Sequence, residues 1–327
     1  MFESPRGHQQ HLTWRNRSVS IFRIAPTGTE GGGALGNLIP PGIAFIVYGV
    51  LMEVSIGRLY FAGIVPGVLV SLLFVLFIFV VALIRPHWAP REPAVAWPVM
   101  VRGVVDLLPT FILMFLVLGT IYLGVATPTE SAAFGVSGAF VLALLAHRVN
   151  PAMLRGVLLS TARSTAVVML ILTGAFVLNS TFALLGIPHA ISQAVAAMKL
   201  TPLPTIGVLV ALYLVLGTFM DGFAMMVTTI PVILPVLKAQ NIDLVWFGVI
   251  AVMLTEAALI SPPEGLNLYV IQAFRKPQAD GGRGTIMDVY LGVTPFFVLF
   301  VLMMLGIMLV IAFPQLAVWL PNTMRGN

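Results

Sequence analysis

The sequence predicts an all-α polytopic membrane protein. Of its 327 residues, 59% are hydrophobic and only 9% are charged, whereas a soluble domain carries about 25% charged residues. From about Leu35 onward the apolar residues gather in blocks, and roughly 20 such residues cross a bilayer as one helix. We therefore expect a membrane domain over residues 35–327 and a polar, disordered tail over residues 1–34.

The composition excludes several other classes of protein. The chain has no cysteine and five scattered histidines, which rules out disulfides, thiolate catalysis and cysteine-based metal sites. It contains no HExxH or GxSxG motif and no paired intramembrane aspartates, so we expect no enzyme. The net charge of +5 is carried mostly by arginines in short loops, which indicates membrane topology and not nucleic-acid binding.

Two interruptions divide the apolar part of the chain. One falls at Gly217–Gly222 and the other at Ser261–Gly265. Broken helices at membrane depth are tolerated only where their backbone is buried in protein or lines a cavity, so both breaks are candidate site positions. The apolar blocks lie near 38–54, 59–84, 105–125, 131–147, 164–186, 204–219, 223–237, 245–260, 264–274 and 286–313.

The distribution of Lys and Arg predicts the orientation, because cytoplasmic loops carry an excess of both. The loops predicted inside are 85–102, 148–163 and 275–283, and those predicted outside are 126–130 and 188–201. These assignments alternate only if 204–237 is a re-entrant hairpin with both ends outside. Segment 245–274 then crosses once with a break in its middle, and Trp319 lies at the outer interface.

An internal repeat connects the two halves of the membrane domain. The first copy contains Leu38–Pro41 followed by Gly63–Pro66, and the second contains Ile260–Pro263 followed by Gly292–Pro295. The predicted orientation makes these copies cross in opposite directions. Inverted repeats with discontinuous helices are typical of secondary transporters, whose sites lie near the midplane.

The repeat also predicts that the carrier is truncated at its N-terminus. Asp221, at the tip of the second hairpin, precedes Pro262 by 41 residues, and the same offset before Pro40 falls ahead of residue 1. The first copy therefore has no partner hairpin, and its place is taken by the polar tail. We expect this chain to be the later part of a longer transporter.

Several motifs in order resemble the large membrane subunit (DctM-like) of the TRAP transporters, the tripartite ATP-independent periplasmic carriers. The resemblance covers about residues 35–327. Each motif alone is modest, but their order and spacing are specific. The motifs are Gly36-Asn37-Leu38-Ile39-Pro40-Pro41, the runs 49–57 and 63–67, Thr127-Pro128-Thr129-Glu130-Ser131, Gly217-Thr218-Phe219-Met220-Asp221-Gly222, Pro231–Pro235, Trp246–Val249 and Ser261-Pro262-Pro263-Glu264-Gly265-Leu266-Asn267-Leu268.

The resemblance implies a multi-pass permease of the bacterial inner membrane that takes up organic acids, such as C4-dicarboxylates, by symport with Na⁺. It implies a periplasmic substrate-binding protein and a small membrane subunit as partners, and no cofactor beyond the coupling Na⁺. The implied ion and substrate positions are Gly36, Asn37, Pro40 and Pro41 in the first copy, and Gly217, Asp221, Gly222, Ser261, Pro262, Gly265 and Asn267 in the second. The alternative is a split-gene or non-functional fragment of such a permease.

The chemistry of some residues stays open at this point. A proline ring frees upstream carbonyls, which suit Na⁺, although a simple kink is the other interpretation. Asp221 can neutralise a cation or cap the returning helix. We favour a structural role for Glu130 as the partner in a helix cap, and hydrogen bonds to helix carbonyls for Thr228 and Thr229. The roles of Glu256 and Glu264, acids at membrane depth, are undecided.

Overall fold

The computed structural model describes residues 36, 38–84, 97–198, 200–220, 222–260 and 294–324, and within them every regular element is a helix. The all-α prediction is thus confirmed. Five helices, α3, α4, α5, α6 and α9, are long and apolar enough to cross a membrane. The helices are α2 (Ile43–Met52), α3 (Ile56–Ile84), α4 (Trp97–Tyr122), α5 (Pro128–Leu145), α6 (Pro151–Leu184), α7 (Ile187–Ala197), α8 (Pro202–Gly217), α9 (Gly222–Ala239), α10 (Leu244–Ile260), α13 (Thr294–Ala312), α14 (Gln315–Val318) and the 3₁₀ turn η1 (Pro321–Thr323).

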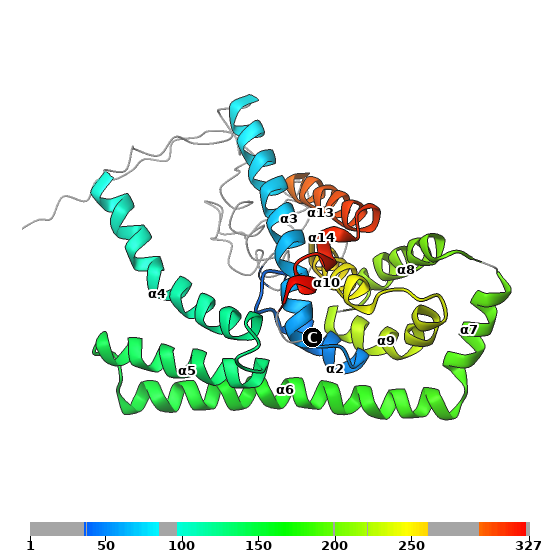
Figure 1. The fold of residues 1–327 in the computed structure, drawn as a ribbon, viewed down its shortest axis with the longest axis horizontal. Coiled ribbons are helices and arrows are strands. Elements are labelled where there is room, and N and C mark those ends of the chain that lie inside the picture. The colour runs from blue at the N-terminus through cyan, green and yellow to red at the C-terminus, as the bar shows by residue number, and fades with distance from the viewer. Residues whose placement is uncertain are drawn as a thin grey trace, which may run out of the picture.

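A central group of helices holds most of the buried side chains. It consists of α2, α3, α8, α9, α10, α13 and α14, in which α10 packs against α8, α13, α3 and α9. Residues 249–254 of α10 are buried on every side, as expected for a helix that is apolar all round and surrounded by other helices. Figure 1 shows α10 in the middle of this group, with α3 passing beside it.

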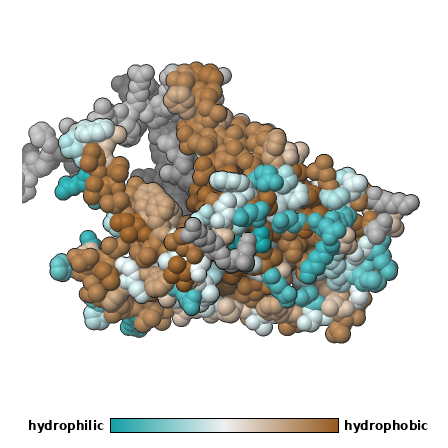
Figure 2. Space-filling model, viewed as in Figure 1, coloured by the Kyte–Doolittle hydropathy of each residue, from teal (hydrophilic) through white to brown (hydrophobic). Residues whose placement is uncertain are grey.

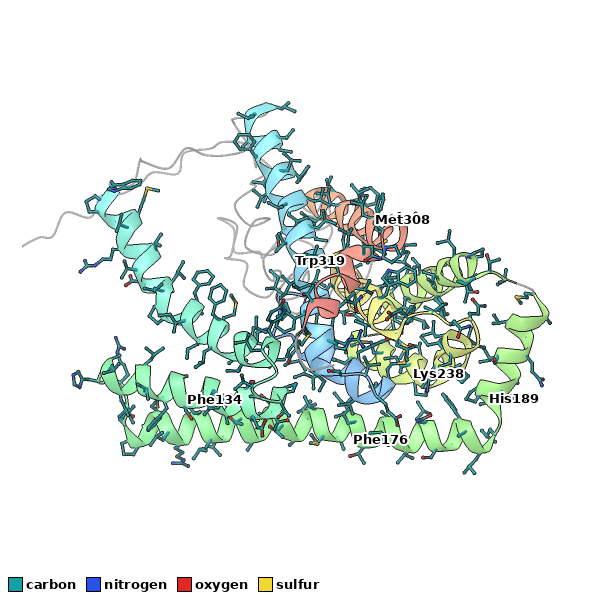
Figure 3. The ribbon with its side chains drawn as sticks, in the orientation of Figure 1. Phe134, Phe176, His189, Lys238, Met308 and Trp319 are labelled. Carbon is teal, nitrogen blue, oxygen red and sulfur yellow. The ribbon has the colours of Figure 1, made fainter. Side chains whose placement is uncertain are left out.

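Helices α4, α5 and the first half of α6 form an arm that extends from the central group, whereas the second half of α6 passes along α9 (Figure 1). Few of their side chains are buried, and large apolar residues such as Phe115, Leu145 and Leu170 are exposed by 68%, 71% and 74%. Figure 3 shows Phe134 on α5, away from the central group, and Phe176 on the part of α6 that passes below α2 and α9. Exposure of so large an apolar surface to water is unfavourable, so the arm lies in lipid or against other membrane-embedded chains.

The hairpin of α4 and α5 is held by local contacts. Thr127 accepts a hydrogen bond from the Glu130 backbone N–H at 3.3 Å, and the Glu130 carboxylate accepts one from the Thr127 N–H at 2.8 Å. This capping box confirms the structural role expected for Glu130. At the next residue, the hydroxyl of Ser131 lies 2.9 Å from that of Thr120 and connects the two helices.

Two helices differ from the pattern of apolar blocks. The loop expected at 188–201 contains α7, a short helix that packs against α9. The block expected at 164–186 is the second half of α6, which begins at Pro151 behind an Asn150 cap. Apolarity marks the part of a helix at membrane depth, and a helix can continue beyond it because its backbone hydrogen bonds are internal. In Figure 2, apolar surface follows α3 and much of the arm, while polar residues gather on the side that holds α7 and α9.

Candidate functional site

The break predicted at Gly217–Gly222 is a turn between two helices. Helix α8 ends at Gly217, and the Met220 N–H donates to the Leu216 carbonyl at 2.8 Å across the turn before α9 begins at Gly222. The two arms are joined by Tyr213 and Thr229, whose hydroxyls lie 2.7 Å apart. Since the Thr229 hydroxyl donates to the Met225 carbonyl at 2.8 Å, Tyr213 is the donor in this pair. The segment is therefore a closed helical hairpin.

The tip of this hairpin packs against the last turns of α10. A Cβ atom added to Gly217 would lie 2.5 Å from the Cβ of Ala258, and one added to Gly222 would lie 2.9 Å from the Cβ of Thr255. Neither distance is compatible with a side chain, so both glycines are there for close approach and not for a special backbone angle. The glycines at the two ends of the turn thus bring the hairpin tip onto one face of α10.

Polar side chains accompany this contact at membrane depth. Thr255 and Glu256, in the last turns of α10, are exposed by 3% and 1%, and Thr229 of the hairpin by 8%. Buried polar groups in a membrane domain are costly and usually belong to a site. The chain continues from α10 directly into Ser261–Gly265, the second predicted break, which lies outside the described residues.

The segment at Leu38, ahead of α2, packs against a glycine face of α3. Leu38 is fully buried, and a Cβ on Gly63 would lie 3.1 Å from its carbonyl oxygen, while one on Gly67 would lie 3.6 Å from the same atom. The backbone is extended at Gly42, where α2 begins without a side-chain cap. Gly42 offers no side-chain oxygen to the first N–H groups of α2, which lie at the positive end of the helix dipole.

Helix α2 packs against both α9 and α10. The Tyr48 hydroxyl donates to the Leu244 carbonyl at the start of α10 at 2.7 Å. Val47 packs with Val227 of α9 and with Leu172 of α6 in one apolar cluster. Helix α2 therefore connects the hairpin arm α9 to α10, although the inverted symmetry itself stays a prediction.

Five of the predicted site residues lie in the described part of the chain. Pro40, Gly217 and Gly222 are buried, whereas Gly36 and Pro41 are exposed. The contacts bring Gly217 and Gly222 together on α10. The other predicted positions, which fall outside the described residues, are Asn37, Asp221, Ser261, Pro262, Gly265 and Asn267.

The structure confirms the role expected for one residue near the site and adds two residues that the sequence did not indicate. Thr228 donates to the Ala224 carbonyl at 2.9 Å, which confirms the structural role expected for it. Tyr213 and Thr255 were not predicted as site residues. Tyr213 joins the two helices of the hairpin through Thr229, and Thr255 contacts the hairpin at Gly222. Tyr213 could have been identified from the sequence, because its hydroxyl lies one helical turn before the predicted break at Gly217.

The fold and the hairpin define a class, a multi-pass α-helical membrane protein with an interrupted hairpin packed on its central helix. A family model described as the tripartite ATP-independent periplasmic transporter, DctM component, matches residues 24–315. The chain belongs to this family. Its members are permease components, so the prediction that the chain is not an enzyme is confirmed, as is its place in the bacterial inner membrane. The match begins ahead of Leu35, and the boundary of the polar tail stays a prediction.

Curated relatives support the same assignment. The C4-dicarboxylate TRAP transporter large permease protein DctM of Vibrio cholerae is 29% identical over 90% of this chain and 67% of its own length. The protein of the same name from Pseudomonas aeruginosa is 34% identical over 74% of this chain and 56% of its own length. The ectoine/5-hydroxyectoine large permease protein UehC of Ruegeria pomeroyi is 30% identical over 86% of this chain and 64% of its own length. The chain thus spans between about half and two thirds of these relatives.

Proposed function

We propose that this chain is the membrane permease subunit of a TRAP-type transporter, or the later part of one, which takes up organic acids together with Na⁺. The observation that carries the proposal is the glycine pair Gly217 and Gly222, which seats the hairpin tip against α10 beside the buried Thr255 and Glu256. Secondary carriers place their sites near the membrane midplane at the ends of discontinuous helices, and this hairpin ends at such a position.

The ends of the helices offer the chemistry for both solutes. Helices α8 and α10 end with their C-termini at the two predicted breaks, and carbonyl oxygens at helix C-termini are hard ligands suited to Na⁺. The uncapped N-terminus of α2 and the start of α9 present N–H groups and partial positive charge, which suit a substrate carboxylate. In this proposal Glu256 keeps negative charge near the coupling ion.

The proposed partners are a small membrane subunit and a periplasmic binding protein that delivers the substrate. The exposed apolar arm of α4–α6 supplies lipid- or subunit-facing surface for a membrane partner. The relatives are named for different solutes, C4-dicarboxylates and ectoine among them. We propose an organic acid because the helix N-termini favour carboxylates.

The test is uptake in proteoliposomes that contain this chain, the small subunit and an externally added binding protein. Labelled succinate, as the C4-dicarboxylate probe, should accumulate under an inward Na⁺ gradient and should not accumulate when K⁺ replaces Na⁺. A proton gradient in place of the Na⁺ gradient tests the coupling ion separately. No uptake of succinate or of a panel of other organic acids under any gradient would contradict transport by this chain.

A matched pair of variants connects uptake to the site. Gly217→Ala should reduce uptake strongly, because its methyl group meets Ala258. Gly207→Ala lies on the same helix, where an added Cβ has nothing within 4 Å, and should leave uptake near the wild-type rate. An equal loss of uptake in both variants would show that α8 tolerates no substitution. The contact between the hairpin and α10 would then not explain the effect of Gly217→Ala.

A further inference from the structure

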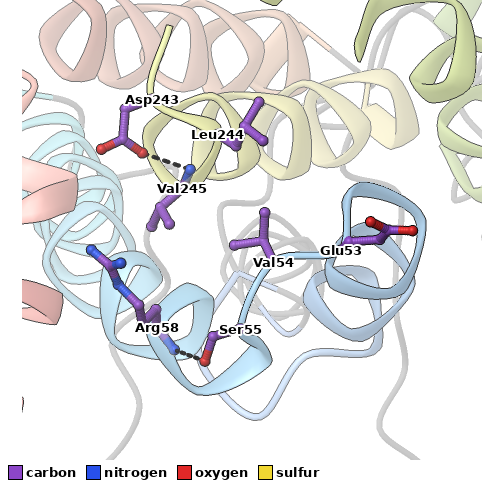
Figure 4. A pocket seen from close by; sticks show the side chains of 7 residues that line it. All are labelled: Glu53, Val54, Ser55, Arg58, Asp243, Leu244 and Val245. Carbon is purple, nitrogen blue, oxygen red and sulfur yellow. Dashed lines mark hydrogen bonds between the residues drawn. The ribbon is translucent and has the colours of Figure 1, made fainter. Parts of the chain in front are cut away.

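A second polar feature lies at the other end of α10, away from the hairpin tip. A cleft of about 340 Å³ opens where the α2–α3 turn meets the start of α10, and its lining is Glu53, Val54, Ser55, Arg58, Asp243, Leu244 and Val245. Figure 4 shows the guanidinium of Arg58 directed toward Asp243 across the cleft, with Glu53 on the far side. The orientation predicted from the Lys and Arg distribution puts this end of the molecule at the outer face.

The charges in this cleft are not explained by the stability of their own helices. Arg58 is in the first turn of α3, at the positive end of the helix dipole, and Glu53 follows the last residue of α2, at the negative end. Both placements are unfavourable for the helix that carries them. Asp243 does cap α10, accepting from the N–H groups of Val245 at 2.7 Å and Trp246 at 3.1 Å, but only one of its oxygens is used in this way.

Arg58 has donor capacity left over. One Nη atom donates to the side-chain oxygen of Asn322 at 3.3 Å, while its Nε is buried and has no hydrogen-bond partner within the described part of the chain. Buried donors are nearly always paired, so an unpaired one beside a cleft indicates a missing acceptor. The cleft thus offers one guanidinium and a helix N-terminus to an anion, and two carboxylates to a cation.

The depth of the cleft in the membrane favours one occupant. Helix α3 has 29 residues and is about 43 Å long, whereas the hydrocarbon core is about 30 Å thick, so its ends reach the headgroup layer. Arg58 is the third residue of this helix, and Trp246, whose indole N–H donates to the Val310 carbonyl at 2.9 Å, is next to the cleft wall. Tryptophan is enriched at this level of the bilayer.

We propose that this cleft binds the headgroup of a zwitterionic phospholipid with a primary ammonium group, phosphatidylethanolamine. Its phosphate accepts hydrogen bonds from Arg58 and from the N–H groups at the start of α3. Its ammonium donates to Glu53 and to the free oxygen of Asp243. The site goes beyond the transport function and does not depend on it.

Native mass spectrometry of the delipidated chain in detergent tests this assignment. Phosphatidylethanolamine should bind at least about tenfold more tightly than phosphatidylcholine, which has no ammonium N–H, or phosphatidylglycerol, which has no cation. Equal affinity for the three lipids would overturn the proposal. Binding of free phosphoethanolamine as tight as that of the lipid would also overturn it, in favour of a soluble zwitterion.

Variants locate the binding to the cleft. Arg58→Gln and Asp243→Asn should each abolish the preference for phosphatidylethanolamine, and asparagine retains the helix cap that aspartate provides. Arg155→Gln, on an exposed part of α6, is the charge-matched control and should retain the preference. Circular dichroism and gel filtration establish that the variants fold. Variants that keep the lipid preference but lose association with the small membrane subunit would overturn the proposal in favour of a protein partner.

Discussion

The close approach of the hairpin tip to α10 makes a strong prediction about stability. Replacing Gly217 with alanine places a methyl group 2.5 Å from the Ala258 Cβ, well inside van der Waals contact. The Ala258 Cα lies 3.4 Å away, so the obstacle is partly backbone and cannot rotate aside. Overpacking of this kind costs about 1–3 kcal/mol.

The assay is unfolding of the detergent-solubilised chain by a titration with sodium dodecyl sulfate, followed by circular dichroism. Gly217→Ala should lower the free energy of unfolding by the amount given by overpacking, about 1–3 kcal/mol. Gly207→Ala on the same helix should stay within about 0.5 kcal/mol of wild type or rise slightly, because alanine favours helix and nothing lies within 4 Å of the added atom.

A double-mutant cycle separates the clash from other effects. Ala258→Gly removes the methyl group that the new side chain meets, so Gly217→Ala combined with Ala258→Gly should recover most of the loss. The expected interaction energy is about 0.5–3 kcal/mol in the favourable direction. Additive effects of the two substitutions, with no recovery in the double variant, would show that α8 and α10 are not in contact there and would refute the packing described for the site.

Three further predictions concern other contacts. Tyr213→Phe removes the 2.7 Å bond to Thr229 and should cost about 0.6–1.7 kcal/mol in the same titration, with no additional loss in a Tyr213→Phe, Thr229→Val double variant beyond that of Thr229→Val. Thr127→Ala removes the cap of α5 and should cost about 1 kcal/mol, seen as faster hydrogen exchange at the first amides of that helix. Gly63→Ala directs a methyl group at the Phe45 ring of α2, 2.6 Å away, and should lower Na⁺-dependent uptake by displacing the start of α2, whereas Gly103→Ala, with open space around it, should not.

Much of the fold was predictable because apolarity reports membrane depth. The blocks that correspond to α3, α8, α9 and α10 were placed within a few residues, and the break at Gly217–Gly222 was located from glycine, threonine and aspartate in an apolar run. The first half of α6 was not predicted as helix, because its Arg155 and Arg163 have the composition of a loop. A helix satisfies its own backbone hydrogen bonds, so it can include charged residues beyond its most apolar part, where composition carries little signal.

The candidate site was predictable at the level of segments and not of contacts. The sequence indicated that Gly217 and Gly222 flank a break, but their approach to Ala258 and Thr255 depends on how two helices cross. The bond between Tyr213 and Thr229 likewise arises from the geometry of the hairpin and not from the spacing of the residues. Helix α7 was missed because its short, mixed sequence is not distinguishable from a polar loop by apolar length alone.

The hydrogen bond of Arg58 also has a consequence for the order in which the chain folds. Its bond to Asn322 spans 264 residues, whereas the Thr120–Ser131 contact of the α4–α5 hairpin spans 11. Loop closure over so long a separation comes late in folding. During synthesis the α4–α5 pair can therefore assemble while the C-terminal part is still absent. The start of α3, made long before the C-terminal part, reaches its final packing only after α14 and η1 are made.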